Sequence, residues 1–502
     1  MARKPKKSTK STESKDPSKA LTPREQRAII FGLLLSMLLA ALDQTIVAPA
    51  LPTIGLALND LGQLSWVVTV YLLAATAVTP LYGKLADIHG RRVMLNGAIV
   101  VFVIGSVLCA LSPTVLLLSI SRAVQGLGGG GLIALAQTTI GDAVAPRERA
   151  RYQGLIASVF ASASVAGPLL GGFFAEHLHW SYIFWINIPL GAVAMLVMNR
   201  ALKDLPQNHH KHRLDLLGAA LMLIGTLSLL FALTWGGVRF AWASPPILAL
   251  LACFAVFAAL FIWRLRRAAE PLLPLDVLRD KVVLHGIAAA SFGMGGFVGL
   301  VVHVPLYLEQ VVGLSASQAG LALIALMIGT PIGATISGRA MLKLNHYKLF
   351  ALIGVPTSTA GLMALGLFGA GMPLWAIEIA LALIGMGIGT MFPVTTVAVQ
   401  NAVDRRHLGV VTGMLNFNRQ LLSALMVAAF GTIMLSVAGP AVVGGELGST
   451  AVTLPNVADM ARGYRFVFLA AAGSMAIGLI NLIFMEERPL RSSATPQTAV
   501  EI

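Results

Sequence analysis

The sequence carries a long series of apolar segments, and this series restricts the possible folds more than any other feature. Fourteen segments each hold about 20 or more mainly apolar residues, the length that a helix needs to span a bilayer. They lie near 28–50, 64–83, 93–111, 114–140, 152–175, 181–202, 214–235, 245–264, 284–311, 316–338, 349–370, 374–400, 408–436 and 463–485. The chain is therefore predicted to be an all-α polytopic membrane protein with fourteen transmembrane helices.

The composition agrees with a membrane protein and excludes a soluble enzyme. Only 12% of the 502 residues are charged and 57% are hydrophobic, and the mean hydropathy is +0.80. A soluble domain carries about 25% charged residues. The 50 glycines suit helices that pack closely in lipid. Cys109 and Cys253 fall inside apolar segments, so neither a disulfide framework nor redox chemistry is expected.

The placement of the positive charges predicts the topology. With the N-terminus in the cytoplasm, 31 of the 36 Lys and Arg residues fall in the inner loops and tails, as the positive-inside rule requires. Arg239, Arg462 and Arg465 fall outside, and Arg122 and Arg419 lie within helices. We therefore expect both termini to be cytoplasmic. The net charge of +14 then reflects topology rather than binding of nucleic acid.

Two basic stretches outside the apolar segments are predicted to be unstructured. Residues 1–27 hold nine Lys and Arg and no apolar run, which is typical of a disordered tail. Contact of this tail with anionic lipid head groups is the alternative. The run HHKH, 209–212, lies in a linker without partner ligands, so we expect a solvated loop and no metal site.

A carboxylate and a guanidinium inside the apolar segments form the first candidate site. Asp43 lies about 22 Å along the first segment and Arg122 about 12 Å along the fourth, which runs in the opposite direction. The two groups are therefore expected at similar depth, sharing one cavity. Ionisable groups within a membrane are costly and mostly functional, and a buried carboxylate can take up a proton. We interpret the pair as a proton-coupling site; a static packing bridge is the alternative.

The first inner connection holds the pattern GKLADIHGRR, which forms the second candidate site. Gly83 and Gly90 permit tight turns and close backbone approach. Asp87 can accept hydrogen bonds from helix N-termini or pair with Arg91 and Arg92. We expect this cluster to act as a latch on the inner face, and an ordinary basic loop is the alternative.

Four further polar residues lie within apolar segments and are secondary candidates. Glu309 and His303 fall near the outer end of the ninth segment, and Glu378 falls near the outer end of the twelfth. Either glutamate is a second coupling carboxylate or simply faces water. Arg419 lies near the middle of the thirteenth segment and needs a partner or a wet cavity, which indicates contacts with a substrate or with the latch.

Five motifs, in chain order, resemble the major facilitator superfamily and its fourteen-helix drug:proton antiporter branch. GKLADIHGRR looks like the signature loop of the superfamily, and RAVQGLGGG, which begins at Arg122, resembles its helix-4 motif. SASVAGPLLGG, 162–172, is similar to the helix-5 antiporter motif. LDQTIVAPALP, 42–52, and WSYIFWINIPLG, 180–191, resemble the helix-1 motif and the start of helix 6 in that branch.

The helix-5 motif also has a physical meaning of its own. Gly167 and Pro168 interrupt the helical hydrogen bonds and are expected to bend the helix. Ala163, Gly167, Gly171 and Gly172 form a stripe of small residues that lets another helix approach closely. The resemblance implies that this region seals one face of the transporter against leak.

The sequence departs from the family pattern at several positions. Ala163 stands where the helix-5 motif has glycine, Ala48 where the helix-1 motif has asparagine, and Ser181 where arginine is usual after Trp180. Pro49 is also unusual and is expected to bend the outer end of its helix.

The second half of the chain repeats the signature loop only weakly. In GRAMLKLNHYK, 338–348, Gly338 and Arg339 match the first half, but Leu342 replaces the aspartate and Asn345 replaces the second glycine. We therefore expect the first half to carry the latch.

The resemblance implies a fold of two six-helix halves plus a two-helix insert. The expected parts are a basic tail at 1–27, an N-terminal half at 28–202, the insert with its linkers at 203–280, a C-terminal half at 281–486 and a second tail at 487–502. A fold of this kind binds its substrate near the middle of the membrane, between the halves.

The resemblance further implies a monomeric, proton-coupled antiporter in the cytoplasmic (inner) membrane of a bacterium, which exports lipophilic, often cationic, compounds. Its partners are then small lipophilic substrates, protons and the lipid bilayer. No cofactor is expected, because the chain has no P-loop and the proton gradient is the implied energy source. A dedicated exporter of an endogenous amphiphile, such as a lipid or siderophore, is the alternative. A membrane-embedded transferase or hydrolase is disfavoured, because we find no DxxD, HExxH or GxSxG pattern.

Overall fold

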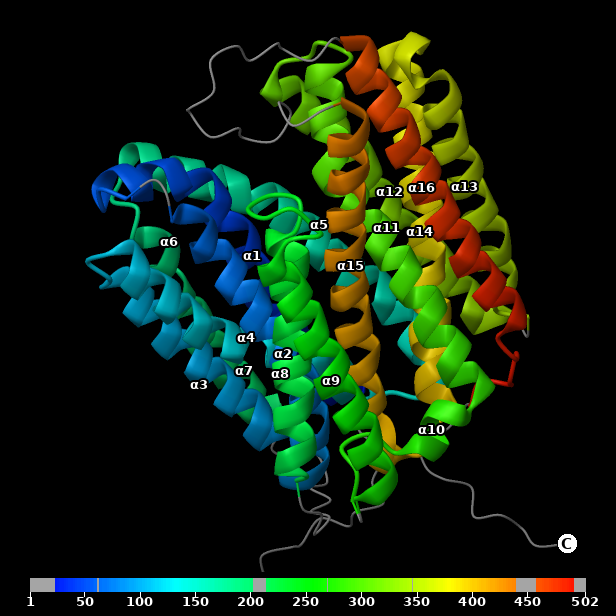
Figure 1. Ribbon diagram of the computed structural model, residues 1–502. Helices are drawn as coiled ribbons and strands as arrows, with labels where there is room; N and C mark the ends of the chain where they lie inside the picture. The colour runs from blue at the N-terminus through cyan, green and yellow to red at the C-terminus, as the bar shows by residue number, and fades with distance from the viewer. Residues whose placement is uncertain are drawn as a thin grey trace, which may run out of the picture.

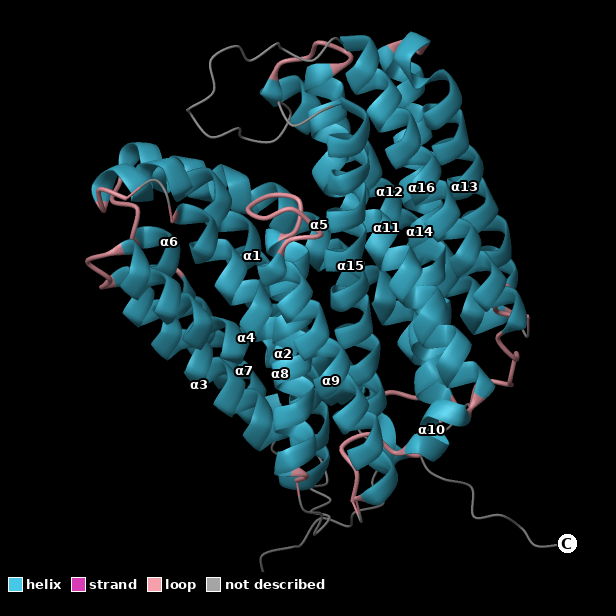
Figure 2. Cartoon of the chain, viewed as in Figure 1, coloured by secondary structure: helices cyan, strands magenta, loops and turns pink. Residues whose placement is uncertain are grey.

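The computed structural model of the protein describes residues 23–60, 63–201, 214–268, 270–344, 346–438 and 457–491, and nearly all of these residues are helical (Figures 1 and 2). Extended structure in these ranges is limited to one isolated bridge between Gly236 and Phe240. The all-helical class predicted from the sequence is therefore confirmed.

The helices form two groups with a pair of helices between them (Figure 1). The N-terminal group holds α1 (Pro23–Ala57), α2 (Leu64–His89), α3 (Arg91–Ala110), α4 (Val115–Ala143), α5 (Pro146–His177), α6 (Tyr182–Trp185) and α7 (Asn187–Ala201). The C-terminal group holds α11 (Lys281–Gln310), α12 (Ala316–Lys343), α13 (Leu349–Phe368), η2 (Gly369–Gly371), α14 (Leu374–Asn401), η3 (Arg405–His407), α15 (Leu408–Ala438) and α16 (Val457–Phe484). Between the groups lie α8 (Leu216–Trp235), α9 (Pro245–Arg267) and the short α10 (Leu275–Arg279), and α8 packs on both α2 and α15.

Thirteen helical stretches of the described residues are long and apolar enough to cross a membrane, with α6 and α7 counting as one stretch. The remaining long helix is α15, whose 31 residues also exceed the length of a span. Its Asn416, Arg419 and Gln420 lower its hydropathy. With α15 included, the helices agree with the fourteen predicted segments.

Helix α1 is longer at both ends than its predicted segment. It begins at Pro23, so part of the expected tail is helical, while residues 1–22 lie outside the described ranges. Proline at a first helical position and Glu25 in the first turn both favour a helix start here. The helix also continues past Pro49 to Ala57, so Pro49 does not end it.

The two groups of helices meet at one end of the bundle and lie apart at the other (Figure 1). The end where they meet carries the start of α1, the connection from α2 to α3, and α10. We call this the basic end, because Arg91, Arg147 and Lys343 lie at it, and we call the other the opposite end.

At the basic end, the segment after α16 is fixed to the rest of the C-terminal group. The Lys348 ammonium donates to the Met485 carbonyl, 2.5 Å away, and the Glu487 carboxylate accepts a bond of 2.9 Å from the Lys348 backbone. Arg488 bridges Asp280 at 2.7 Å and Glu486 at 2.8 Å. The hydrogen bond and charge of Arg488 lower the pKa of the exposed Glu486.

Candidate functional site

The structure brings Asp43 on α1 and Arg122 on α4 into direct contact. Asp43 Oδ2 lies 2.6 Å from Arg122 Nη1, and the two side chains are 0% and 1% exposed. The two residues lie at the same depth on neighbouring helices that run in opposite directions, so their side chains can meet. An ion pair without exposure depends on hydrogen bonds from its surroundings, since desolvation otherwise outweighs the attraction.

Neighbouring amides complete the shell of hydrogen bonds around this pair. Asp43 Oδ1 accepts bonds of 2.8 Å from both Gln125 Nε2 and Asn187 Nδ2. The Arg122 guanidinium also donates to Gln125 Oε1 at 2.6 Å and to the Val67 carbonyl at 3.1 Å. With Arg122, three donors converge on the carboxylate, so both of its oxygens have hydrogen-bond partners.

A serine and an aromatic pair join this shell to the surrounding helices. Ser106 Oγ on α3 accepts from Gln125 and Asn187 and donates to the Phe184 carbonyl. The Arg122 guanidinium lies 4.0 Å from the centre of the Tyr71 ring and 5.8 Å from that of Phe184. The pair is therefore enclosed by α1, α2, α3, α4, α6 and α7.

The small residues of α5 pack against the part of α1 that carries Asp43. A Cβ atom at Gly167 would collide with the Thr45 side chain, and one at Gly171 would collide with the Ile46 carbonyl. Thr45 Oγ1 also donates to the Ala163 carbonyl at 2.8 Å. Helix α5 runs through Pro168 as one element.

Gly172 does not belong to this stripe, which corrects the sequence interpretation. A Cβ atom at Gly172 would meet nothing within 4 Å. Residues 163, 167 and 171 are four apart and share one face, whereas residue 172 points about 100° away from residue 171 on a helix of 3.6 residues per turn.

The candidate latch joins the two groups of helices at the basic end. Asp87 Oδ2 accepts a bond of 3.1 Å from the backbone N–H of Val410, at the start of α15 in the other group. Asp87 Oδ1 pairs with Arg91 at 2.5 Å, and Arg91 pairs with Asp142 at 2.7 Å. A carboxylate from one group therefore caps a helix of the other.

Two glycines of the latch meet different requirements. A Cβ atom at Gly83 would collide with the Gly409 carbonyl, so this position permits backbone contact between the groups. Gly90 has φ 87°, which favours glycine. Arg92 does not join the latch, because its Nε donates to Asn199 on α7 at 3.2 Å.

A second contact between the groups joins α5 to α12. A Cβ atom at Gly338 would collide with the Ala150 carbonyl, and Arg147 Nε donates to the Leu342 carbonyl at 3.0 Å. The weak sequence repeat at 338–348 thus contributes to closure through its backbone. Asn345 lies outside the described residues.

The secondary candidates lie in two different environments. Glu309 and Glu378 are half-buried near the opposite end of α11 and α14. His303 is 5% exposed, contacts the Gly299 carbonyl within its own helix at 2.9 Å, and lies edge-on to Phe430. Arg419 is 8% exposed and donates to Thr396 Oγ1 at 2.9 Å. None of the four contacts Asp43 or Arg122 in the part of the chain that the structure describes.

Sequence reasoning missed the neutral and backbone partners of both candidate sites. Gln125 lies one helical turn after Arg122, and Asn187 is a lone amide in an apolar stretch; these two positions were the available signals. Nothing local indicated Gly409 or Val410, because they are more than 300 residues from Asp87 in the chain.

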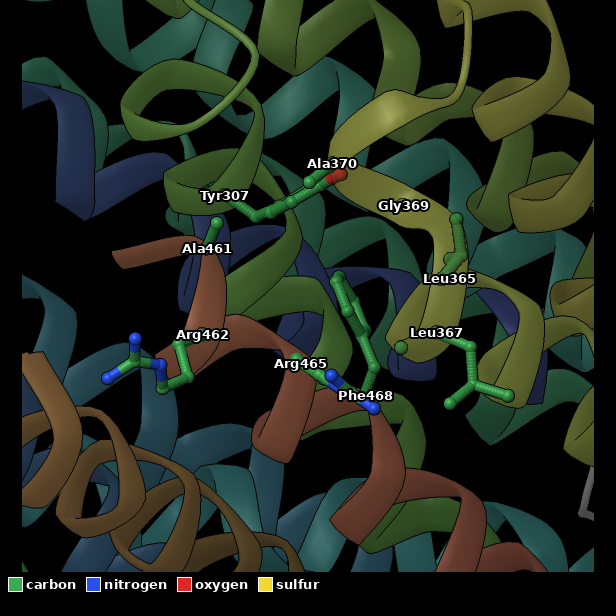
Figure 3. Close-up of a pocket in the computed structure, with 10 residues that line it drawn as sticks. Tyr307, Leu365, Leu367, Gly369, Ala370, Ala461, Arg462, Arg465 and Phe468 are labelled. Atoms are coloured by element: carbon green, nitrogen blue, oxygen red, sulfur yellow. The ribbon is translucent and has the colours of Figure 1, made fainter. Parts of the chain in front are cut away.

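A small hollow at the opposite end of the C-terminal group lies apart from these sites (Figure 3). Its volume is about 230 Å³, and Tyr307, Phe468, Arg462 and Arg465 are among its lining residues. No cluster of three or more metal-ligand side chains occurs among the described residues. The run 209–212 lies outside them.

Comparisons with known proteins identify the family. The model of the Major Facilitator Superfamily matches residues 33–216 and 214–427. "Multidrug resistance protein 3" of Bacillus subtilis (strain 168) is 33% identical over 409 residues, covering 82% of this chain and 80% of that relative. "Multidrug transporter protein MdtP" of the same strain is 32% identical over 406 residues, covering 81% and 75%. "Uncharacterized MFS-type transporter Rv1877" of Mycobacterium tuberculosis (strain ATCC 25618 / H37Rv) is 35% identical over 488 residues, covering 94% and 71%.

Solved structures agree at the level of the fold. The proton:xylose symporter XylE has a TM-score of 0.63 at 14% identity, covering 93% of this chain and 96% of that one. A bacterial homologue of the iron transporter ferroportin, in an outward-facing state, has a TM-score of 0.64 at 11% identity, covering 93% and 100%. The chain belongs to the Major Facilitator Superfamily, and it is a membrane transporter and not an enzyme.

Proposed function

We propose that the protein is a proton-coupled antiporter that exports lipophilic compounds, cationic ones among them, by alternating access. The observation that carries the proposal is the Asp43–Arg122 pair, which lies fully buried inside one half of a membrane transporter. The names of the two Bacillus subtilis relatives, a multidrug transporter and a multidrug resistance protein, support export of several compounds.

In the proposed cycle, Asp43 takes up a proton from the side of the opposite end. Protonation removes the negative charge that Arg122, Gln125 and Asn187 hold in place. The network then rearranges around α1 and α4, and this change shifts the balance between states open to either side.

The available energy is of the right order for this step. Removing one partner of a buried ion pair costs about 3–5 kcal/mol. A proton that crosses the membrane down a pH difference of about one unit and a membrane potential of about 100 mV releases about 4 kcal/mol. The gradient can therefore drive a transition that depends on this pair, with no further energy source.

Closure at the basic end supports the alternating-access part of the proposal. Asp87, Gly83 and Val410 join the two groups there, and Arg147 joins them through Leu342. In the proposed orientation this end faces the cytoplasm of a bacterium, with both chain termini on that side. The substrate then leaves toward the opposite end, and the protein works as a monomer.

A dedicated exporter of one endogenous amphiphile remains the second candidate. The same proton pair and latch would serve it, so the site alone does not separate the two. Deletion of the gene separates them, because a multidrug exporter then sensitises cells to unrelated dyes, whereas a dedicated exporter causes one metabolite to accumulate.

The test is transport of ethidium in liposomes under an imposed pH gradient, with wild type compared with Asp43→Asn. We expect gradient-driven transport by wild type and at least a tenfold loss in the variant, because asparagine cannot carry the proton. Glu309→Gln and Glu378→Gln serve as matched controls and are expected to transport at near wild-type rates.

Two results would count against the proposal. Full activity of Asp43→Asn would make Asp43 structural and leave the two glutamates as the coupling candidates. Transport by wild type that ignores the pH gradient would remove proton coupling altogether.

A further inference from the structure

Arg419 is a buried cation whose hydrogen-bonding capacity is largely unused. It lies on α15 with 8% of its surface exposed. Its Nη2 donates to Thr396 Oγ1 at 2.9 Å and, more weakly, to Thr395 Oγ1 at 3.4 Å. Its Nε is buried without a hydrogen-bond partner among the described residues. A guanidinium has five N–H donors, so most of them remain available.

Other buried arginines of the described chain have stronger acceptors. Arg122 has the Asp43 carboxylate and the Val67 carbonyl, and Arg91 has two carboxylates. Arg419 has neither a carboxylate nor a carbonyl acceptor within the described ranges. Its other partner is the Phe392 ring, whose centre lies 5.5 Å from the guanidinium. A buried charge with only hydroxyl and aromatic partners is expensive, and in a membrane such a residue is functional by default.

The surroundings of Arg419 are polar but uncharged. Asn416 Nδ2 donates to Gln137 Oε1 of α4 at 2.9 Å, and Thr76 of α2 donates to Gln420 at 2.9 Å. These bonds cross between the two groups of helices directly beside Arg419. The environment therefore offers hydrogen bonds but no negative charge.

Arg419 also lies where the two groups begin to separate. Among the described residues, the hydrogen bonds that join the N-terminal and C-terminal groups all lie between the basic end and Gln420. Beyond Gln420, α15 continues for 18 residues toward the opposite end, where the groups lie apart (Figure 1). Arg419 is about 17 Å from the start of α15, near the middle of the membrane, which is where transporters of this architecture bind substrate.

We propose that Arg419 binds an anionic group, a carboxylate, sulfonate or phosphate, on compounds that the transporter exports. The inference rests on the proposed export function and extends its substrate class to lipophilic anions. The planar guanidinium keeps Nε–H and Nη1–H donors free on two different edges, so an anionic oxygen at either edge can accept a charge-assisted hydrogen bond. The bound anion supplies the charge that the protein does not.

The test uses two dyes that share a xanthene core but differ in charge. Fluorescein is the anion and a rhodamine ester is the cation, and gradient-driven transport of each is measured in liposomes. We expect wild type to move both dyes. We expect Arg419→Gln to lose fluorescein transport at least tenfold, since a charge-assisted pair is lost, while rhodamine transport stays within about twofold. Arg419→Lys keeps the charge without the planar donors. Its fluorescein transport is expected to lie between that of wild type and that of Arg419→Gln.

Arg266→Gln is the matched control, because it removes an exposed guanidinium at the end of α9. Transport of both dyes by this variant should equal that of wild type. Equal loss of both dyes in Arg419→Gln would mean a structural role and overturn the inference. Transport of rhodamine but never fluorescein by wild type would also overturn it, while leaving the proposed export function intact.

Binding measured without a gradient separates the two proposals. Fluorescein anisotropy is followed with detergent-solubilised wild type and Arg419→Gln. Fluorescein binding to wild type that weakens at least tenfold in the variant supports the anion site even when neither dye is transported in liposomes. Absence of fluorescein binding to a folded wild-type protein contradicts it.

Discussion

At the residue scale, the Asp43–Arg122 pair should behave as one unit in stability as well as in coupling. Asp43→Asn or Arg122→Gln alone leaves one charge buried, and each should cost about 3–5 kcal/mol of unfolding free energy. The double variant removes both charges and should lose no more stability than either single variant, which corresponds to a coupling of about 3 kcal/mol or more. The thermal midpoint Tm in detergent, followed for all four proteins, measures this.

The exposed pair Asp459–Arg462 is a matched control within the same chain. Its atoms lie 3.7 Å apart, with side chains 46% and 64% exposed. Asp459→Asn and Arg462→Gln should change the unfolding free energy by less than about 1 kcal/mol. If the buried and exposed pairs gave equal losses, burial would not be the source of the strength of the first pair.

At the scale of the helix, packing of α5 on α1 positions the carboxylate. Gly167→Ala places a methyl group against Thr45, two residues from Asp43, and should cost about 1–3 kcal/mol and reduce transport. Gly172→Ala adds the same methyl group on the same helix in open space. It should be neutral or stabilising by up to about 1 kcal/mol. Transport and Tm are measured for both variants, and similar effects of the two would refute the packing role.

The same comparison shows how far sequence reasoning reaches. Rise per residue was enough to set Asp43 and Arg122 at one depth, because the position of a residue along a spanning helix fixes its depth. The rotation of a helix about its axis is not fixed in this way, so the sequence alone does not show that Gly171 and Gly172 face different neighbours. Gln125 and Asn187 are uncharged, so the sequence alone does not mark them as partners of a carboxylate. Only the fold shows that these amides face Asp43.

At the scale of the whole molecule, closure of the basic end depends on contacts between segments far apart in the chain. Asp87 caps α15 across the interface, and α5 meets α12 through backbone contacts. The sequence predicted a latch in the first half but could not name its partner in the second. Glycine-rich packing at 83 and 409 makes the contact specific to this closed arrangement, because any larger residue would hold the two backbones apart.

Asp87→Ala should therefore open the basic end. The variant loses the cap on Val410 and the pair with Arg91, which together bias the closed state by about 1–3 kcal/mol, so the open population should rise about 5- to 150-fold. Spin labels at the exposed His89 of α2 and Lys343 of α12 report on the distance between the groups. We expect a longer distance to gain population in the variant. Arg92→Ala, which removes a contact within the N-terminal group only, should leave the distribution unchanged. An unchanged distribution in Asp87→Ala would show that the backbone contacts at Gly83 and Gly338 hold this end closed without the carboxylate.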